Sequence, residues 1–566
     1  MRKPAGLLYG LGELPPWPVV LLNGVQHVGV ITINLIYPVL VFRLAGAPTG
    51  TITELVAVGL VILAITTFMQ IAPRGPIGTG YMCPTTFTAT YLAPSLLAAK
   101  MGGLPLVFGM TMFAGLVETA LARALHRLRA VVPAELSGLV IILIGLTAGL
   151  VAIRTIAGTD ARPPDAADWT VAALTLAVTI ALNVWGNGFA RMLSALLGMI
   201  TGYIAAAALD LFPTADIDQL RAADWIALPT LRHVSWSFDS GLIAAFGITA
   251  LAAAMKAMGT ITMCQKANDA DWVRSDNRMN ARGVIADGLG STLSGLMGGV
   301  GINTSTPSVG IATASGVTSR VVAYAVAGLF LALALTPKFA AVLAIMPRPV
   351  MGAALVFAAC FILISGLQIA TSRLLDSRRT LTIGLGLIAG ISVEVIPALA
   401  GAAPGWLKPF VGSSLVFGTA VALVLNFLFR LGVRKRVVLA IDPAADVATV
   451  IDDFFRRQGA AWGARPDIVG RATFGAQQLV ESIVEYGGAR GPLELEASFD
   501  EFSLNVQVRY EGRVLEVPDR RPGLDEIRDS EDGAMRLAGF LLRRNADGIR
   551  AQKQGARALI RFHFDH

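Results

Sequence analysis

A charged side chain inside an apolar segment is the strongest chemical signal in the sequence. Lys256 lies well inside the apolar residues 240–263. A lysine at that depth of a membrane costs several kcal/mol unless it meets water, a partner or a ligand, or its long stem carries the ammonium to the surface. Helical spacing places Thr249 and Thr260 on the same face as Lys256. The pattern predicts a ligand-binding ammonium at Lys256, supported by Thr260.

Three carboxylates also lie in apolar segments. Asp287, on the segment after Lys256, is the natural partner of that lysine. It could form an ion pair with Lys256 or a hydrogen bond between packed helices, and the sequence leaves both roles open. Glu118 and Glu394 lie in other apolar segments, where we expect structural or interfacial roles.

The first apolar segment, near residues 18–44, also carries polar side chains. Gln26 and His27 are adjacent inside this segment, and Asn34 follows two turns later. A buried histidine is usually a satisfied structural group, and the alternative is that Gln26 and His27 support a ligand or its coupling ion. We expect Asn34 to face the same cavity as Lys256.

Two short polar segments, 84–99 and 306–316, are the least helix-like parts of the apolar region, and each follows an extended-looking stretch. Broken helices leave backbone groups unpaired, which a membrane tolerates only where they line a cavity or meet a ligand. The alternative is a pair of proline kinks packed against neighbouring helices. Such segments at matching positions of two halves indicate a transporter site. The predicted substrate contacts there are Thr85, Thr86, Phe87, Thr306, Pro307 and Ser308.

The composition places these residues in a membrane protein. The 566 residues are 54% hydrophobic and 15% charged, whereas a soluble domain is about 25% charged. Stretches apolar enough to cross a bilayer recur about fourteen times before residue 430, with 84–99 third and 306–316 tenth. We predict an all-α polytopic membrane protein with two seven-span halves that carry their broken segments at matching positions. Basic residues cluster in alternate loops, which predicts a cell (inner) membrane protein with both termini cytoplasmic.

The residue pattern indicates no metal, cofactor, nucleic acid or catalysis. The three cysteines are far apart, and the five histidines lack ligand spacing. The net charge of +7 is spread over short loops. No nucleophile–base pair or intact phosphate loop is present. We therefore expect a protein that is not an enzyme and whose partners are a small molecule and the lipid bilayer.

The composition changes abruptly near residue 437. Charged residues become frequent, and apolar and polar residues alternate in 493–496 and 504–508. The chain is therefore predicted to divide into a membrane transport domain, 1–436, and a small cytoplasmic α/β domain, 437–566.

The ten residues 307–316, Pro-Ser-Val-Gly-Ile-Ala-Thr-Ala-Ser-Gly, resemble the signature of the nucleobase–ascorbate transporter (xanthine/uracil permease) family. Gln26-His27 and residues 346–352 are also similar to family features, and the resemblance covers roughly 17–430. It implies a seven-plus-seven inverted repeat with a core domain that holds the substrate and a gate domain. It also implies alternating access and a homodimer. The implied substrates are xanthine, uracil, urate or ascorbate, carried by symport with H+ or Na+.

The chain departs from the family at two positions. Glutamates that bind the base in the family correspond to Lys256 and Pro307 here. A charged lysine donates hydrogen bonds but accepts none, so the substitution favours an anionic substrate such as urate, or another small anion. A fixed ammonium could also replace the coupling cation. The resemblance further implies that Phe87 packs on the substrate ring, that Thr306 offers its backbone amide and that Asn34 lies near the first-span contact.

The tail has a resemblance of its own. Residues 478–487 are similar to the first nucleotide box of histidine-kinase-type ATPases, especially anti-sigma-factor kinases. Gln478, Ser482 and Tyr486 replace the Glu, Asn and His of that box, and Tyr510 replaces the adenine-binding aspartate. These changes remove the magnesium ligand and the adenine acceptor. We expect a degenerate fold that serves regulation or oligomer contacts.

Three hypotheses follow. The first is a secondary active transporter of a nucleobase-like molecule, shifted towards anions by Lys256. The second is a transporter-like membrane sensor that signals through the C-terminal domain. The third is an anion transporter or channel unrelated to nucleobases, although the sequence has no repeated ring of charges.

Overall fold

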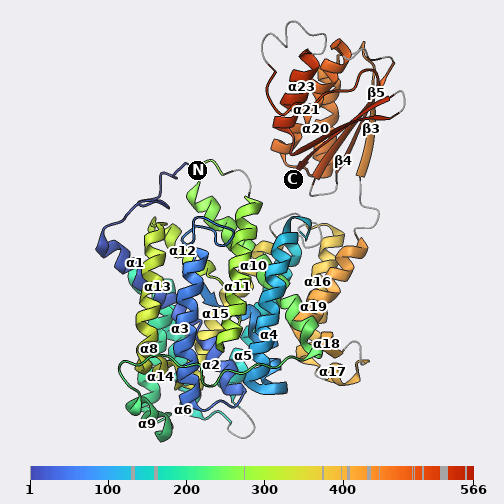
Figure 1. The fold of residues 1–566 in the computed structure, drawn as a ribbon. Coiled ribbons are helices and arrows are strands. Elements are labelled where there is room, and N and C mark those ends of the chain that lie inside the picture. The colour runs from blue at the N-terminus through green and yellow to red at the C-terminus, as the bar shows by residue number, and fades with distance from the viewer. Residues whose placement is uncertain are drawn as a thin grey trace. The chain divides into compact units, whose positions relative to one another are not determined.

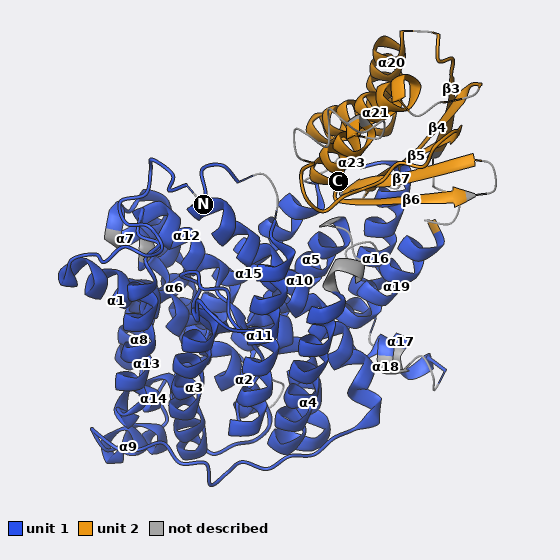
Figure 2. Cartoon of the chain, turned by 45° about the horizontal axis from the view of Figure 1, so that its top comes forward, with its two compact units in different colours: residues 1–428 blue, residues 429–566 orange. Residues whose placement is uncertain are grey.

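The fold is taken from a computed structural model of the chain (Figure 1). It describes residues 2–128, 134–158, 163–272, 275–371, 375–396, 398–404, 408–429, 435–444, 446–486, 489, 491–499, 503–522, 533–554 and 557–565. Two compact units divide it, Met1–Leu428 and Phe429–His566 (Figure 2). The change in composition at residue 437 falls just inside the second unit, because strand β3 begins at Lys435.

The first unit is a helical assembly with two very short strands. Its elements are α1 Trp17–Ile33, α2 Ile36–Leu44, α3 Thr49–Gln70, β1 Thr85–Phe87, η1 Ala89–Tyr91, α4 Leu92–Leu128, α5 Ala134–Ala157, α6 Ala166–Trp185, α7 Gly188–Met192, α8 Ser194–Ala208, α9 Thr214–Ala222, η2 Ser240–Leu242, α10 Ile243–Asn268, α11 Asn277–Met297, β2 Ile302–Thr304, α12 Thr306–Ser315, α13 Arg320–Ala334, α14 Pro337–Ala344, α15 Arg348–Ala370, α16 Ser377–Val395, α17 Ala398–Ala402, α18 Lys408–Val411 and α19 Ser414–Phe429.

Among the described residues, seven helices are long and apolar enough to cross a membrane. An eighth span results if α13 and α14, which meet at 83°, count as one broken span. Helix α11 falls outside this group because its arginines, asparagines and Asp287 make it too polar. The fourteen spans and the inverted repeat stay predictions.

The segment expected as a short helix over 84–99 starts differently. Residues 85–87 form a strand, a 3-10 turn follows, and α4 begins only at Leu92. The run Thr85-Thr86-Phe87 consists of β-branched and aromatic residues, which suit a strand. Helix α4 then contains a kink at Gly102 and Gly103, where φ of Gly103 is +65°. The expected segments 84–99 and 104–124 therefore meet at this kink.

Strands β1 and β2 pair with each other in antiparallel register. Thr85 lies opposite Thr304, and Phe87 lies opposite Ile302. The Ser305 N–H extends the ladder by donating to the Pro84 carbonyl at 2.9 Å. Two segments more than two hundred positions apart in sequence are thereby joined through their backbones. Helix α12 leaves this junction directly and ends at Gly316, whose φ is +69°.

Helices α4 and α11 approach so closely that their backbones touch. A Cβ atom added to Gly115 would lie 2.4 Å from the Thr292 nitrogen and 2.5 Å from the Gly288 carbonyl oxygen. A Cβ at Gly295 would lie 2.6 Å from the Phe108 carbonyl oxygen. Membrane helices gain no hydrophobic free energy by associating in lipid, so small residues stabilise their contacts by allowing close van der Waals packing.

The second unit is an α/β sandwich. It contains β3 Lys435–Ile441, α20 Val447–Trp462, α21 Pro466–Tyr486, β4 Leu493–Phe499, β5 Ser503–Glu511, α23 Gly533–Asn545, β6 Gly548–Gln554 and β7 Arg557–Asp565. The sheet is antiparallel with order β3-β4-β5-β7-β6, and the three helices gather on one side of it (Figure 2).

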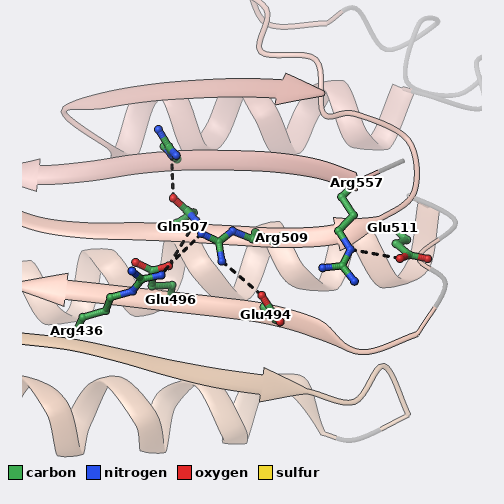
Figure 3. A network of polar contacts seen from close by, with 8 residues as sticks. Arg436, Glu494, Glu496, Gln507, Arg509, Glu511 and Arg557 are labelled. Carbon is green, nitrogen blue, oxygen red and sulfur yellow. Dashed lines mark hydrogen bonds and ion pairs between the residues drawn. The ribbon is translucent and has the colours of Figure 1, made fainter. Parts of the chain in front are cut away.

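Alternation along β5 shows how the sheet of this unit is built. Leu504, Val506 and Val508 are buried in the core, while Gln507 and Arg509 belong to the polar face. Charged side chains from several strands form a network on that face (Figure 3). Its pairs are Arg436 with Glu496 at 2.5 Å, Arg509 with Glu494 at 3.5 Å and with Glu496 at 3.4 Å, and Arg557 with Glu511 at 3.3 Å.

The α4–α11 contact gives the first prediction. Gly115→Val places carbon atoms where the α11 backbone lies, and we expect a loss of about 3 kcal/mol or more, because overpacking against a backbone cannot relax by rotamer changes. Gly328→Val in α13 is the matched control, because nothing lies within 4 Å of its added Cβ. Thermal unfolding of both variants in detergent measures the difference. Equal midpoints for the two variants would contradict the backbone contact.

Candidate functional site

Strand β1 sorts its side chains onto two sides, as alternation requires. The Thr85 hydroxyl points to α3, where it lies 2.6 Å from the Thr66 hydroxyl and 3.1 Å from the Thr67 hydroxyl. The Phe87 ring faces the same helix and is 1% exposed, so close to Gly59 that a Cβ there would come within 3.2 Å. Thr85 and Phe87 were expected among the substrate contacts, but in this conformation both pack on α3.

The other side of β1 faces polar partners from distant helices. Asn34, at the junction of α1 and α2, donates from Nδ2 to the Thr86 hydroxyl at 2.8 Å. Just beyond the strand, the Thr88 hydroxyl accepts from Lys256 Nζ at 3.0 Å. Asn34 and Lys256, which the sequence predicts to face one cavity, thus contact the same short stretch of chain: Asn34 at Thr86 and Lys256 at Thr88.

Lys256 itself is only partly buried, although it lies inside α10. The small residues of α10 let the neighbouring segments come close to this helix. Ala253, one turn before Lys256, accepts from Asn303 Nδ2 at 3.0 Å, which ties strand β2 to α10. A single hydroxyl satisfies one of the three ammonium donors. The remaining donors suit a ligand that presents oxygen atoms.

The start of α12 meets α10 through a pair of hydroxyls. Thr260 and Thr306 lie 2.7 Å apart at their Oγ1 atoms, one turn along α10 from Lys256. Ser305 caps the helix, because its hydroxyl accepts from the Ser308 N–H at 3.4 Å. Pro307 has no N–H. Of the three substrate contacts predicted at this helix start, Thr306, Pro307 and Ser308, Thr306 alone keeps a backbone N–H for a ligand.

Asp287 does not form the ion pair with Lys256 that was one of its two expected roles. Its Oδ2 accepts from the Thr304 N–H at 3.0 Å, and its Oδ1 accepts from Gln70 Nε2 at 3.2 Å. Among the ion pairs of the described residues, none joins it to Lys256. The carboxylate therefore holds strand β2 against α11 and α3, which is the helix-packing role.

Gln26 and His27 lie buried in α1, a helix that packs on α13, α12 and α8. His27 is fully buried, and neither ring nitrogen has a partner among the described residues. Their part in coupling stays a prediction.

Two residues that contact α10 at this site were not predicted from the sequence. Thr88 holds the Lys256 ammonium, and Asn303 holds α10. Period-2 alternation from Thr86 would have indicated Thr88. Asn303 lies in the stretch read as extended, but only the strand pairing fixes which way it points.

The described residues contain no group of three or more His, Cys, Asp or Glu side chains placed to hold a metal ion. In the second unit, Tyr510 is 2% exposed, and its hydroxyl donates to the Arg513 carbonyl at 2.5 Å. The aromatic side chain that stands in for the expected aspartate is therefore part of the hydrophobic core.

Comparisons with known proteins match the first unit. A family model described as "Permease family" matches residues 19–399. The chain is 28% identical over 444 residues to the xanthine permease XanP of Escherichia coli, a match that covers 75% of this chain and 94% of XanP. It is 27% identical over 431 residues to a putative purine permease of Clostridium perfringens, covering 75% and 93%.

A solved structure is similar in fold alone. The murine anion transporter Slc26a9, in its inward-facing state, superposes with a TM-score of 0.52 at 12% sequence identity. The match covers 77% of this chain and 72% of that one.

Removal of the Asp287 carboxylate tests its packing role. We expect Asp287→Ala to lower the free energy of unfolding by about 1–3 kcal/mol, because the buried Thr304 N–H loses its acceptor. Asp287→Asn should cost less, since its side-chain oxygen can still accept from Thr304. Asp218→Ala is the control, because Asp218 makes only an exposed 3.9 Å pair. Thermal unfolding in detergent ranks the three variants, and a loss for Asp287→Ala no larger than the control would refute the assignment.

The position of Tyr510 predicts that the full chain does not bind ATP. The Tyr510 hydroxyl is buried and bonded to the Arg513 carbonyl, so it does not replace the aspartate as acceptor for the adenine amino group. Millimolar Mg-ATP should therefore leave thermal unfolding unchanged relative to equal Mg-GTP. An ATP-specific stabilisation would show that the second unit keeps a nucleotide site.

Proposed function

This chain belongs to the permease family that its residues 19–399 match, and from that premise we propose that it is a secondary transporter of a nucleobase-like molecule, with preference for an anionic purine. It is a multi-pass membrane protein and not an enzyme. The proposal of a purine rests on the relatives, which are named xanthine and purine permeases.

The observation that carries the proposal is the meeting of Lys256 with the β1–β2 junction. The ammonium contacts Thr88, just beyond β1. Thr306, the first residue of α12, meets α10 through its hydroxyl at Thr260, one turn from Lys256. The N-terminus of a helix carries partial positive charge. An ammonium and a helix N-terminus side by side favour a ligand with negative charge or several carbonyl oxygens, as in xanthine and urate.

In this proposal Lys256 binds the substrate oxygens, Asn34, Thr86 and Thr260 line the same site, and Thr306 donates from its backbone. Stacking on Phe87 requires the ring to expose a face that α3 now covers. Alternating access would move this group against the rest of the membrane unit, across fourteen spans with both termini in the cytoplasm, in a homodimer.

Charge at position 256 should decide substrate preference. In proteoliposomes we expect uptake of labelled xanthine and urate, with unlabelled urate competing better than neutral uracil. Lys256→Met should lower urate uptake about ten- to a hundredfold, because a charge-assisted hydrogen bond contributes about 1.5–3 kcal/mol. Lys256→Glu should reverse the order and favour uracil, since a carboxylate accepts from the N–H edge of a neutral base.

Lys100→Met is the matched control, because Lys100 is exposed on α4 and its loss should leave uptake unchanged. Better competition by uracil than by urate, unaltered in Lys256→Met, would exclude the anion preference. Binding of purines without any uptake would instead support a membrane sensor.

A further inference from the structure

Glu118 is a buried acid that the proposed substrate site does not use. It lies in α4 and is 0% exposed. Its Oε2 accepts from the Tyr91 hydroxyl at 3.1 Å, while Oε1 has no partner among the described residues. A carboxylate in apolar surroundings with one unpartnered oxygen is costly, whereas a neutral carboxylic acid is far cheaper to bury.

The other buried acids of the described first unit all have better partners. Glu135 pairs with Arg379 at 2.8 Å. Asp168 accepts from the Asp165 N–H at 3.3 Å in the capping box of α6. Asp287 accepts two hydrogen bonds from N–H donors. Glu118 alone has a phenol as its one hydrogen-bonding partner, so it is the buried acid whose surroundings suit a change of protonation.

Tyr91 connects Glu118 to the candidate substrate site. It ends the 3-10 turn that follows Thr88, the residue that holds Lys256. The Tyr91 ring packs against Gly301, because a Cβ added to that glycine would come within 2.1 Å of the ring. The Thr88 N–H donates to the Gly301 carbonyl at 3.3 Å. A shift of the β1–β2 junction therefore moves the hydroxyl that contacts Glu118.

The charged and titratable groups that act on Glu118 come from three neighbouring elements. They are Tyr91 from η1, Asp287 from α11 and Lys256 from α10. Helices α10 and α11, which carry Lys256 and Asp287, both pack on α4. By charge alone, a neighbouring carboxylate disfavours a second negative charge and an ammonium favours it. An anion bound at Lys256 would cancel the field of that ammonium at Glu118.

We propose that Glu118 binds the proton that is transported with the substrate, and that Tyr91 and Lys256 link its protonation to substrate binding. This inference rests on the proposed transport function. With the site empty, the ammonium favours loss of the proton. With an anion bound, the protonated acid is favoured, so substrate and proton bind together and each raises the affinity for the other.

The experiment separates exchange from accumulation. Full-length protein in proteoliposomes is assayed with labelled xanthine and urate, once by counterflow at equal pH and once under an inward proton gradient. Counterflow needs substrate binding and conformational exchange but no net proton movement. For wild type we expect both activities. If one proton moves with each substrate molecule, the ratio of inside to outside substrate should rise about tenfold for each pH unit of gradient.

Glu118→Gln mimics the protonated acid permanently. We expect counterflow within about twofold of wild type and complete loss of gradient-driven accumulation. Glu54→Gln, at a half-exposed carboxylate near the start of α3 that contacts Thr230 and His233, is the matched control and should keep both activities. Accumulation by Glu118→Gln equal to wild type overturns the inference, as does a wild type that exchanges substrate without responding to the gradient.

Failure of the transport function gives a different result, because neither purine would then exchange even in wild type. If Glu118→Gln does not fold, Tyr91→Phe serves as the second variant. It removes only a hydroxyl that stabilises the ionised acid, so protonation should persist to higher pH. The midpoint of the pH profile of uptake should rise by up to about one unit, and an unchanged midpoint overturns the inference.

Discussion

The backbone pairing of β1 with β2 is the constraint on which the rest of the membrane unit depends. Each strand interrupts what would otherwise be a membrane helix, and alone each would leave its N–H and C=O groups without partners in an apolar medium. Paired, they satisfy one another, from Ser305 with Pro84 through Phe87 opposite Ile302. The two interruptions are therefore stable only together, and their pairing fixes where α4 and α12 begin.

From this pairing the side chains of the site are placed by alternation. Thr85 and Phe87 must face one way and Thr86 the other, with Thr88 beyond it. On the first side, the Thr85 hydroxyl meets Thr66 and Thr67 of α3. On the second side, the Thr86 and Thr88 hydroxyls meet Asn34 and Lys256. A shift of register by one residue would exchange the two sets, and the ammonium would face a phenylalanine.

The sequence was sufficient to identify the segments but not the direction of each side chain. Composition indicated membrane helices, and the prolines and threonines near 84 and 306 indicated the two interruptions. A lysine amid alanines indicated Lys256. The sequence could not show that Thr85 faces α3 or that Asn303 reaches α10. Each of these depends on the pairing of strands from distant segments, which has no local signal.

The partner of Asp287 also could not be predicted from the sequence. A buried acid near a lysine within the same group of helices suggests an ion pair, yet the acid accepts from the Thr304 N–H and from Gln70 instead. That arrangement leaves Lys256 with a neutral hydroxyl as its contact. A positive charge inside a membrane protein without a carboxylate in contact is costly, and a bound anion removes that cost. The use of Asp287 in packing thus keeps the ammonium available to a ligand, which links the stability of the fold to the charge of its substrate.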